Sequence, residues 1–482
     1  MSKRPERQRL ERDSIGELAV PARAYYGIQT LRAAKNFPIS GIRARPVFIT
    51  ATAMIKEAAA RTNLSLGLLD RKRAKAIIRA ASEIASGLFH DEFIVDVYQA
   101  GAGTSHNMNA NEVIANRAIE LLGGRPGDYS VVHPNDHVNA SQSTNDVIPA
   151  SLRVAAIISS DRLVRSLKGL SGTFRKKAVA FDGIIKSGRT HLQDAVPIRL
   201  GQEFGGYASA LESSVERLTG AVMRLKRIGL GGTATGTGMN THPRYRKTVV
   251  RELAAVTGLK GLRTAPDYFA AANSMGDFTA LSGALRDTAT ELTRIANDIR
   301  LLSSGPATGL AEITLPAVQP GSSIMPGKVN PVMAEMLDMA AFQVIGNDLA
   351  ITLAAGAGQL EINVMTPLIT HNLLQSIEIL ANATSAFDRR CVSGIKANAS
   401  RCAAYFEGST GLATALNTII GYEAAAAIVK KAQQGNRSIK ETVLDAGVMS
   451  KDEWTRLMQP RRITEPSLPE RPAMRRKRRR KG

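Results

Sequence analysis

Five long stretches of the sequence carry apolar residues at helical spacing. They fall at about residues 148–180, 201–228, 270–304, 332–355 and 370–390. Several exceed 20 residues, which is longer than the usual helix of a globular protein. Neither a sustained strand-type alternation nor a fixed-period repeat accompanies them. The pattern therefore predicts an all-α fold built around a central bundle of long helices.

The composition agrees with a folded helical protein. Apolar residues make up 44% of the chain and charged residues 22%, while only 5% are aromatic. Because 482 residues exceed one ordinary core, we expect several domains. The predicted domains are an N-terminal helical domain at 13–142, the bundle at 143–399 and a small helical domain at 400–459. The first is expected to open with loops up to about residue 41, with helices beginning near Thr50.

Positive charge is concentrated at both ends of the sequence. The formal net charge is +21, of which residues 1–12 contribute +3 and residues 460–482 contribute +8. The final RRKRRRKG offers nothing apolar to bury, so we expect a disordered basic leader at 1–12 and a disordered basic tail at 460–482. Such a tail either contacts nucleic acid weakly and non-specifically or acts only as a solubilising segment.

Signals for export, membrane insertion or metal binding are missing from the sequence. The charged N-terminus lacks the apolar segment of a secretory signal, and no apolar run reaches the roughly 18 residues of a membrane span. Cys391 and Cys402 lack metal-type spacing, which favours a reducing cytoplasm. His133 and His137 lie four residues apart without a third ligand. We expect a cytoplasmic protein without metal, cofactor or membrane partner.

Four polar segments interrupt the helical stretches, at 101–109, 139–146, 188–194 and 321–331. They are rich in Gly, Ser, Thr and Asn, which present hydroxyl, amide and backbone N–H donors suited to an anionic ligand. Taken singly, each segment reads as an ordinary helix cap or turn. Together they predict one carboxylate-binding site made of Thr104, Ser143, Thr144, Asn145, Thr190, His191, Ser322, Lys328 and Asn330.

The last of these segments, GSSIMPGKVNP at Gly321–Pro331, resembles the signature of the fumarase/aspartase superfamily. Glu335 follows it at the family spacing. The segments GAGTSHNMNANEV, HPNDHVNASQSTND, GRTHLQDAVP and GGTATGTGMN also appear in the order and approximate spacing of that family. The resemblance covers about residues 13–459.

This resemblance implies a three-domain, almost wholly helical subunit that forms a homotetramer. It also implies active sites built from loops of three different chains around a small dicarboxylate. The strings YYGIQTLRA, GAGTS and QLEINVM are more similar to the aspartase branch than to the fumarase branch. The implied reaction is the reversible, cofactor-free loss of ammonia from L-aspartate to give fumarate.

Two other functions remain open. Thr366 stands where aspartases commonly carry an acidic residue, so hydration of fumarate by a class II type of fumarate hydratase is one alternative. A non-catalytic helical scaffold that binds nucleic acid through its basic tail is the other.

The resemblance also implies roles for the residues of the signature segment. Ser322 acts as the base in its oxyanion form, with Ser323 as the second candidate. Gly321 and Gly327 supply backbone N–H groups and let the segment close as a lid. Lys328 and Asn330 bind the carboxylate that becomes enolate-like, where oriented donors are usually the largest contribution to catalysis.

The other three polar segments are expected to hold the substrate. By the resemblance, Thr190 and His191 lie at the substrate, and Glu335 orients His191. His191 either binds a carboxylate or helps protonation near the leaving group, which are both common roles of histidine. The remaining hydroxyl and amide donors bind the substrate carboxylates and its amino group; they are Thr104, Ser143, Thr144 and Asn145.

Overall fold

The computed structural model describes residues 7–466. They form two compact units, each assembled from three separate ranges of the chain. Unit 1 comprises the residues up to 166 together with 214–290 and 339–383, and unit 2 comprises 167–213, 291–338 and the residues from 384 onward. The predicted domains, by contrast, are three continuous ranges of the sequence. That division stays a prediction.

Helices dominate both units. The longer helices are α1 (Ile28–Asn36), α2 (Pro46–Ser65), α3 (Arg71–Ala85), α4 (Thr104–Leu121), α5 (Thr144–Ala180), α6 (Leu200–Arg224), α7 (Tyr245–Thr257), α9 (Gly276–Leu302), α10 (Val332–Gly356), α11 (Thr366–Arg390), α12 (Ala399–Gly408) and α14 (Tyr422–Gln434). The shorter ones are η1 (His90–Glu92), η2 (Pro134–Val138), α8 (Tyr268–Asn273), η3 (Val392–Gly394), η4 (Thr410–Leu416), α13 (Asn417–Ile420), α15 (Ile439–Asp445), α16 (Lys451–Leu457) and α17 (Pro460–Thr464).

The strands form small two-stranded sheets. They are β1 (Gln8–Asp13), β2 (Gly16–Pro21), β3 (Ile185–Thr190), β4 (Gln193–Arg199), β5 (Arg227–Ile228), β6 (Arg263–Thr264), β7 (Ile313–Thr314) and β8 (Lys396–Ala397). β1 pairs with β2, β3 with β4 and β7 with β8 in antiparallel register, whereas β5 pairs with β6 in parallel register. The predicted mainly helical fold class is confirmed.

The five predicted long helices are present as α5, α6, α9, α10 and α11, and each contributes residues to both units. Polar contacts join them inside unit 1: Asp348 of α10 accepts hydrogen bonds from Ser282 and Arg286 of α9, at 2.5 and 3.0 Å. In unit 2, aromatic packing joins α5 to α6, because the Phe174 ring lies 5.6 Å from that of Tyr207.

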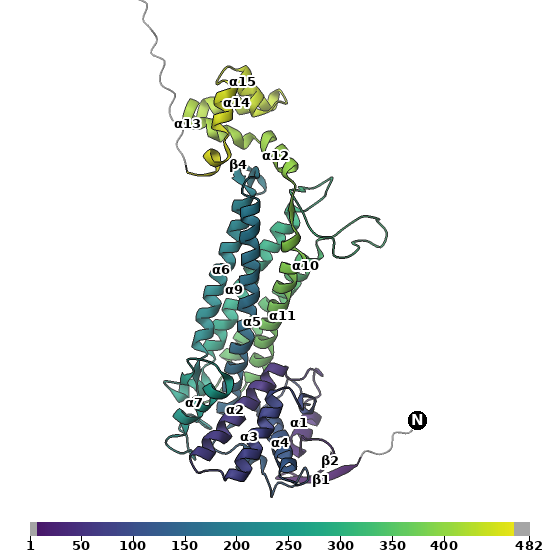
Figure 1. Ribbon diagram of the computed structural model, residues 1–482, viewed down its shortest axis with the longest axis vertical. Coiled ribbons are helices and arrows are strands. Elements are labelled where there is room, and N and C mark those ends of the chain that lie inside the picture. Colours follow the sequence, from purple (N-terminus) through teal and green to yellow (C-terminus); the bar gives the residue numbers. More distant parts are fainter. Residues whose placement is uncertain (1–6, 467–482) are drawn as a thin grey trace, which may run out of the picture. The chain divides into compact units, whose positions relative to one another are not determined.

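Helices α1 to α4 of unit 1 gather beside β1 and β2 at the purple end of the chain (Figure 1). Asp70 caps α3 by accepting hydrogen bonds from the backbone N–H groups of Lys72 and Arg73, both at 3.0 Å. The apolar faces of α2, α3 and α4 bury a core that includes Ile77, Ile84, Phe93, Ile114 and Ile119. This core includes the later turns of α4, the helix at whose start the GAGTS segment lies.

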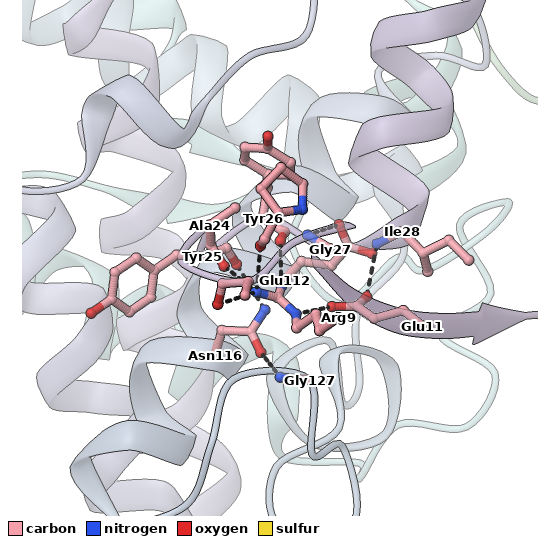
Figure 2. A network of polar contacts seen from close by, with 12 residues as sticks. Arg9, Glu11, Ala24, Tyr25, Tyr26, Gly27, Ile28, Glu112, Asn116 and Gly127 are labelled. Atoms are coloured by element: carbon pink, nitrogen blue, oxygen red, sulfur yellow. Dashed lines mark hydrogen bonds and ion pairs between the residues drawn. The ribbon is translucent and has the colours of Figure 1, made fainter. Parts of the chain in front are cut away.

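The predicted disordered leader is wrong for residues 8–12, which form β1. Arg9 fixes this strand by donating to the carbonyl oxygens of Ala24 and Tyr26 at 2.7 and 2.8 Å and to Glu11 at 2.7 Å (Figure 2). Its guanidinium thus satisfies carbonyls of the segment that leads into α1. The predicted loops up to residue 41 were likewise wrong in part, since they contain β2 and α1.

The predicted disordered tail is wrong for residues 460–466. Pro460–Thr464 form α17, which is anchored by ion pairs of Arg461 with Asp182 at 3.2 Å and of Glu465 with Arg199 at 3.0 Å. Side chains held at both ends explain why a basic segment is ordered here. Residues 1–6 and 467–482, with the RRKRRRKG block and its predicted nucleic-acid contact, lie outside the described residues.

One helix of the described chain, α10, is long and apolar enough to cross a membrane by length and composition alone. Glu335, Asp338 and Asp348 interrupt this helix, so it contains no uninterrupted apolar run of about 18 residues. About a third of its most apolar window is buried inside the chain. Its exposed apolar side chains recur at heptad spacing, at Met339, Phe342, Leu349 and Leu353.

Candidate active site

The predicted site residues of unit 1 meet at the start of α5. The buried carboxylate of Asp146 accepts hydrogen bonds from the backbone N–H groups of Ser143 at 3.0 Å, Gly231 at 2.9 Å and Thr233 at 3.0 Å. Asn145 donates to the carbonyl oxygen of Ala234 at 2.7 Å. The STND and GGTATGTGMN segments, which are far apart in the sequence, are therefore tied together.

A second chain of hydrogen bonds connects Thr144 to a fully buried lysine. Lys56 of α2 donates to the Asn139 side-chain oxygen at 2.8 Å. The amide of Asn107 donates to that same oxygen and to the Thr144 hydroxyl, both at 3.2 Å. The side chain of Thr144 is thus held by Asn107 of α4, which is itself connected through Asn139 to Lys56 of α2.

Burial controls the charges beneath these loops. It lowers the pKa of Lys56 to about 7 and raises the pKa of Asp146 to about 6, and the opposite charges of the two groups act against both shifts. Burial also lowers the pKa of His106 to about 3, helped by repulsion from Lys56. Two buried groups beneath these loops, Lys56 and Asp146, therefore have pKa values close to neutrality.

Thr104 lies at the first position of α4, in a loop of left-handed residues. Gly101, Ala102 and Gly103 have φ values of 86°, 54° and 92°. A Cβ on Gly103 would lie 2.9 Å from Ile148 of α5, so glycine is required there for close approach as well as for conformation. The Thr104 hydroxyl donates to the Gly101 carbonyl at 2.7 Å.

In unit 2, Thr190 and His191 belong to the β3–β4 hairpin rather than to the predicted irregular segment. Thr190 pairs with Gln193, which leaves His191 and Leu192 as a two-residue turn with φ values of 55° and 59°. Two left-handed residues are required by the turn type that matches strand twist. Non-glycine residues there cost about 1–2 kcal/mol each. The turn presents an exposed His191 at its tip.

A buried ionic cluster holds the base of this hairpin. The fully buried Glu312 forms ion pairs with Lys186 at 2.5 Å and with Arg189 at 2.8 Å, and Lys186 also pairs with Glu203 at 3.0 Å. The Arg189 guanidinium lies 5.2 Å from the centre of the Tyr405 ring. Because Arg189 directly precedes Thr190, the cluster fixes the strand that delivers Thr190 and His191.

The signature segment is an exposed loop that closes on itself. The backbone N–H of Gly321 donates to the Lys328 carbonyl at 2.9 Å, and the Asn330 amide donates to the Gly321 carbonyl at 2.7 Å. A Cβ on Gly321 would lie 2.3 Å from that Lys328 oxygen. Glycine is thus required where the two ends of the loop meet.

Inside this loop, the Ser322 hydroxyl oxygen accepts two backbone hydrogen bonds. The donors are the N–H groups of Met325 at 2.9 Å and Ile324 at 3.2 Å. Two N–H dipoles aimed at one oxygen favour negative charge on that oxygen. The same contacts also serve as an ordinary serine turn.

The remaining predicted residues of unit 2 lie in or beside the same loop. Ser323 and Lys328 are exposed, Gly327 has a φ of 80°, and Glu335 lies in the first turn of α10. Within residues 7–466, no hydrogen bond or ion pair joins Glu335 to His191. The predicted orientation of His191 by Glu335 therefore has no contact in a single chain.

The structure thus divides the predicted residues into two groups. Unit 1 brings together Ser143, Thr144 and Asn145 with the loop before Thr104, and unit 2 contains the hairpin of Thr190 and His191 and the loop of Ser322.

The two histidines that suggested a metal pair cap a short helix instead. His133 accepts hydrogen bonds from the N–H groups of Asn135 and Asp136, both at 3.2 Å, and His137 accepts one from the His133 backbone at 2.7 Å. Among the described residues, no group of three or more His, Cys, Asp or Glu could hold a metal ion.

Sequence reasoning missed the buried groups that support the site, namely Lys56, Asp146 and Glu312. The signal for Lys56 was present, because a single lysine interrupts the apolar run ATAMIKEAAA. A long-range partner such as Glu312, more than a hundred residues from Lys186 and Arg189, leaves no local pattern.

Comparison with known proteins agrees with this arrangement. Residues 16–346 match the lyase family, and residues 412–465 match the fumarase C C-terminus family. The chain is 48% identical over 460 residues to an aspartate ammonia-lyase of Bacillus subtilis (strain 168), covering 95% of this chain and 97% of that one. It is 49% identical over 463 residues to a class II fumarate hydratase of Halobacterium salinarum, with the same coverage of both chains.

A solved structure also matches over nearly the whole chain. It is the fumarate lyase:delta crystallin of Brucella melitensis bound to cobalt, with a TM-score of 0.93, 46% identity and coverage of 95% of this chain and 100% of that one. A mainly helical chain matched along its length in this way is an enzyme of the lyase class. It belongs to the fumarase/aspartase superfamily.

Proposed function

We propose that this lyase is an aspartate ammonia-lyase, which reversibly eliminates ammonia from L-aspartate to give fumarate. The observation that carries the proposal is the Ser322 loop, where two backbone N–H groups point at the hydroxyl oxygen within a segment closed by Gly321, Lys328 and Asn330. The motifs typical of the aspartase branch and the relative of that name favour ammonia as the leaving group.

In the proposed reaction, Ser322 in its oxyanion form takes the proton from the carbon beside one substrate carboxylate. Serine is far too weak an acid to ionise without strong stabilisation of its anion, and the two N–H donors and the nearby Lys328 charge supply it. Lys328 and Asn330 bind the carboxylate that becomes a doubly charged, enolate-like group. Its electron pair then forms the double bond as the carbon–nitrogen bond breaks and ammonia leaves.

The other donors position the substrate. Ser143, Thr144 and Asn145 bind its carboxylate and amino groups, Thr104 contributes from the start of α4, and Thr190 and His191 contribute from the hairpin turn. His191 binds in this proposal rather than serving as a dedicated acid, because a protonated amine is a moderate leaving group. The rigid supports beneath Thr144 and Thr190 favour this positioning role.

We further propose that the enzyme is a homotetramer in which each site draws loops from three chains. The exposed heptad face of α10, formed by Met339, Phe342, Leu349 and Leu353, supports this assembly. Such a face is typical of a helix that packs against another helix along a coiled-coil seam. A second copy of this chain is the occupant that fits it.

A two-substrate assay tests the reaction. Formation of fumarate is followed continuously with L-aspartate as the substrate and then with L-malate at equal concentration. We expect rapid turnover of aspartate and at most slow turnover of malate. The reverse result, efficient malate turnover with no reaction of aspartate, would establish the alternative instead.

That alternative is fumarate hydratase, and a specific observation favours it. A class II fumarate hydratase matches this chain at 49% identity, about as closely as the aspartate ammonia-lyase does. The two reactions share the same proton abstraction and the same enolate-like intermediate. Only the group lost from the neighbouring carbon differs, so the predicted site residues serve either one.

A further inference from the structure

A cavity of unit 1 that none of the predicted substrate residues line is lined by three arginines. Its volume is about 280 Å³, and it lies among α5, the end of α6, β5 and the start of α9. The arginines are Arg153, Arg224 and Arg227, and the lining includes two carboxylates, Asp267 and Asp277. No step of the proposed reaction uses this cavity.

Arg153 forms its buried wall. Its side chain is 6% exposed and pairs through Nη1 with Asp277 at 2.8 Å, and its guanidinium lies 5.0 Å from the centre of the Phe278 ring. Within residues 7–466, its Nε and Nη2 atoms donate no hydrogen bond. The guanidinium of a residue that lines the cavity thus keeps two nitrogen donors without a hydrogen-bond partner in the described chain.

Arg224 and Arg227 form the exposed side and have no carboxylate partner. Neither makes an ion pair in the described chain, and the neighbouring Lys226, Lys260 and Arg263 make none either. Arg227 faces Arg263 across the β5–β6 pair. By contrast, Arg251 on the adjacent helix α7 pairs with Glu252 at 3.1 Å.

The two carboxylates of the lining are already engaged. Asp277 pairs with Arg153, and Asp267 caps α8 by accepting from the backbone N–H of Ala270 at 2.9 Å. Burial lowers the pKa of Arg153, its hydrogen bond and ion pair with Asp277 oppose that shift, and the positive charge of Arg227 adds to it. Three arginines against two aspartates leave a net charge of +1 on the lining, before the basic neighbours are counted.

We propose that this cavity is a second anion site that binds a phosphate-class oxyanion, with Arg153 at its floor and Arg224 and Arg227 at its mouth. Guanidinium groups match the oxygens of phosphate in bidentate geometry, and here all three cations of the lining are arginines. The volume exceeds the roughly 30 Å³ of one water molecule several-fold, so a phosphate group with a few further atoms fits.

The site is connected to the predicted substrate loop by one face of α5. Asn145, Pro149 and Arg153 are spaced four residues apart, and all three line a smaller cavity of about 10 Å³. A ligand on Arg153 thus lies two helical turns from Asn145. The binding proposal itself does not depend on which reaction the enzyme catalyses.

The test is isothermal titration of the full chain with inorganic phosphate at constant ionic strength. We expect saturable binding that sulfate displaces and chloride does not. Arg224→Ala/Arg227→Ala should weaken it by about tenfold or more, because each lost guanidinium removes a charge-assisted contact. The matched control, Lys247→Ala/Arg251→Ala on α7, removes the same charge outside the cavity and should bind as wild type does. Arg153→Lys keeps the positive charge but loses the planar guanidinium that can bind two phosphate oxygens at once, so it should also weaken phosphate binding.

A second arm excludes the substrate site, which also binds anions. Saturating fumarate should leave phosphate binding unchanged, and Lys328→Ala should do the same. Displacement by fumarate, equal weakening by the α7 control, or binding only of nucleic acid and not of phosphate would each overturn the proposal. A crystal of the phosphate complex should show the ion on Arg153.

Discussion

At the scale of single residues, the proposed chemistry of this lyase involves groups whose ordinary properties are altered by their neighbours. Ser322 is a weak acid that two backbone N–H groups make a better anion. Lys56 is a buried amine whose pKa burial lowers to about 7, and hydrogen bonds through Asn139 and Asn107 connect it to Thr144. The proposed role of Ser322 and the lowered pKa of Lys56 can each be tested by changing one side chain.

Ser322→Ala should leave folding and assembly intact and lower kcat by about 10³-fold, because the proposed proton-abstracting group is lost. Steady-state rates of fumarate formation provide the measurement, and circular dichroism verifies the fold. Ser323→Ala is the matched control, since the neighbouring hydroxyl is exposed and accepts no such hydrogen bonds. A near-normal kcat for Ser322→Ala would transfer the role of base to another group.

Lys56→Met should flatten the dependence of stability on pH above neutrality. Burial lowers the pKa of Lys56 from 10.5 to about 7. Between these values the unfolded chain holds a proton that the folded chain has released, so the free energy of unfolding of the wild type rises with pH in this window. Below pH 7 both states are protonated and the contribution is constant.

Denaturant titrations at several pH values from neutrality to about pH 10 measure this slope. Lys72→Met, on the exposed face of α3, is the control and should keep the wild-type slope. A wild-type slope in Lys56→Met would contradict the prediction.

The residues that hold the site illustrate what a sequence reveals. Ser322, Lys328 and Asn330 were predictable because they share one short segment. The supporting roles of three buried groups, Lys56, Asp146 and Glu312, were not predictable. Their partners come from other elements, and only the folded structure shows that they are buried. The roles of the predicted residues stay predictions until they are tested.

At the scale of elements, the spacing of apolar residues predicted the long helices correctly, but it did not predict the short strands. Long stretches such as 332–355 average many apolar positions, and α10 spans Val332–Gly356. The β3–β4 hairpin, by contrast, is specified by two left-handed residues and the Glu312 cluster, neither of which a local pattern reveals. β1 was missed because its charged residues suggested disorder, while Arg9 is satisfied by distant carbonyls.

Gly321→Ala should inactivate the enzyme without unfolding it. The new Cβ would lie 2.3 Å from the Lys328 carbonyl oxygen, so the loop around Ser322 cannot close. We expect kcat to fall by about tenfold or more, because small misplacements of reacting groups are costly.

Gly327→Ala is the matched control within the same loop. Its φ is 80° and nothing lies within 4 Å of the new Cβ, so its penalty is only the conformational one of about 1–2 kcal/mol. Comparison of kcat and of the thermal midpoint for both variants provides the measurement. Equal activities of the two variants would contradict the importance of loop closure.

At the scale of the whole molecule, the proposed tetramer makes the exposed face of α10 essential. Phe342→Asp/Leu349→Asp places charges on side chains that are 57% and 63% exposed in the single chain. We expect dissociation to a smaller species in light scattering and loss of activity with it, because a buried unpaired charge is strongly unfavourable. Leu68→Asp, at an exposed position away from α10, is the control. Unchanged mass in the double variant would exclude this face as the interface.

Shared sites also predict complementation between inactive chains. Ser322→Ala and the double variant Thr190→Ala/His191→Ala should each be inactive alone. After subunit exchange, some sites contain only intact loops, so part of the activity should return. The same mixture without exchange provides the control, and no recovery after exchange would count against sites built from several chains.

The interleaved make-up of the two units has a consequence for synthesis on the ribosome. The apolar core of α2, α3 and α4 is complete in sequence by about residue 138, so it is available to fold early. Unit 1 as a whole needs residues up to 383, and unit 2 needs the segment beyond it. The long helices α5, α6, α9 and α10 must therefore wait for partners that emerge last, which makes this nascent chain a natural client for chaperones.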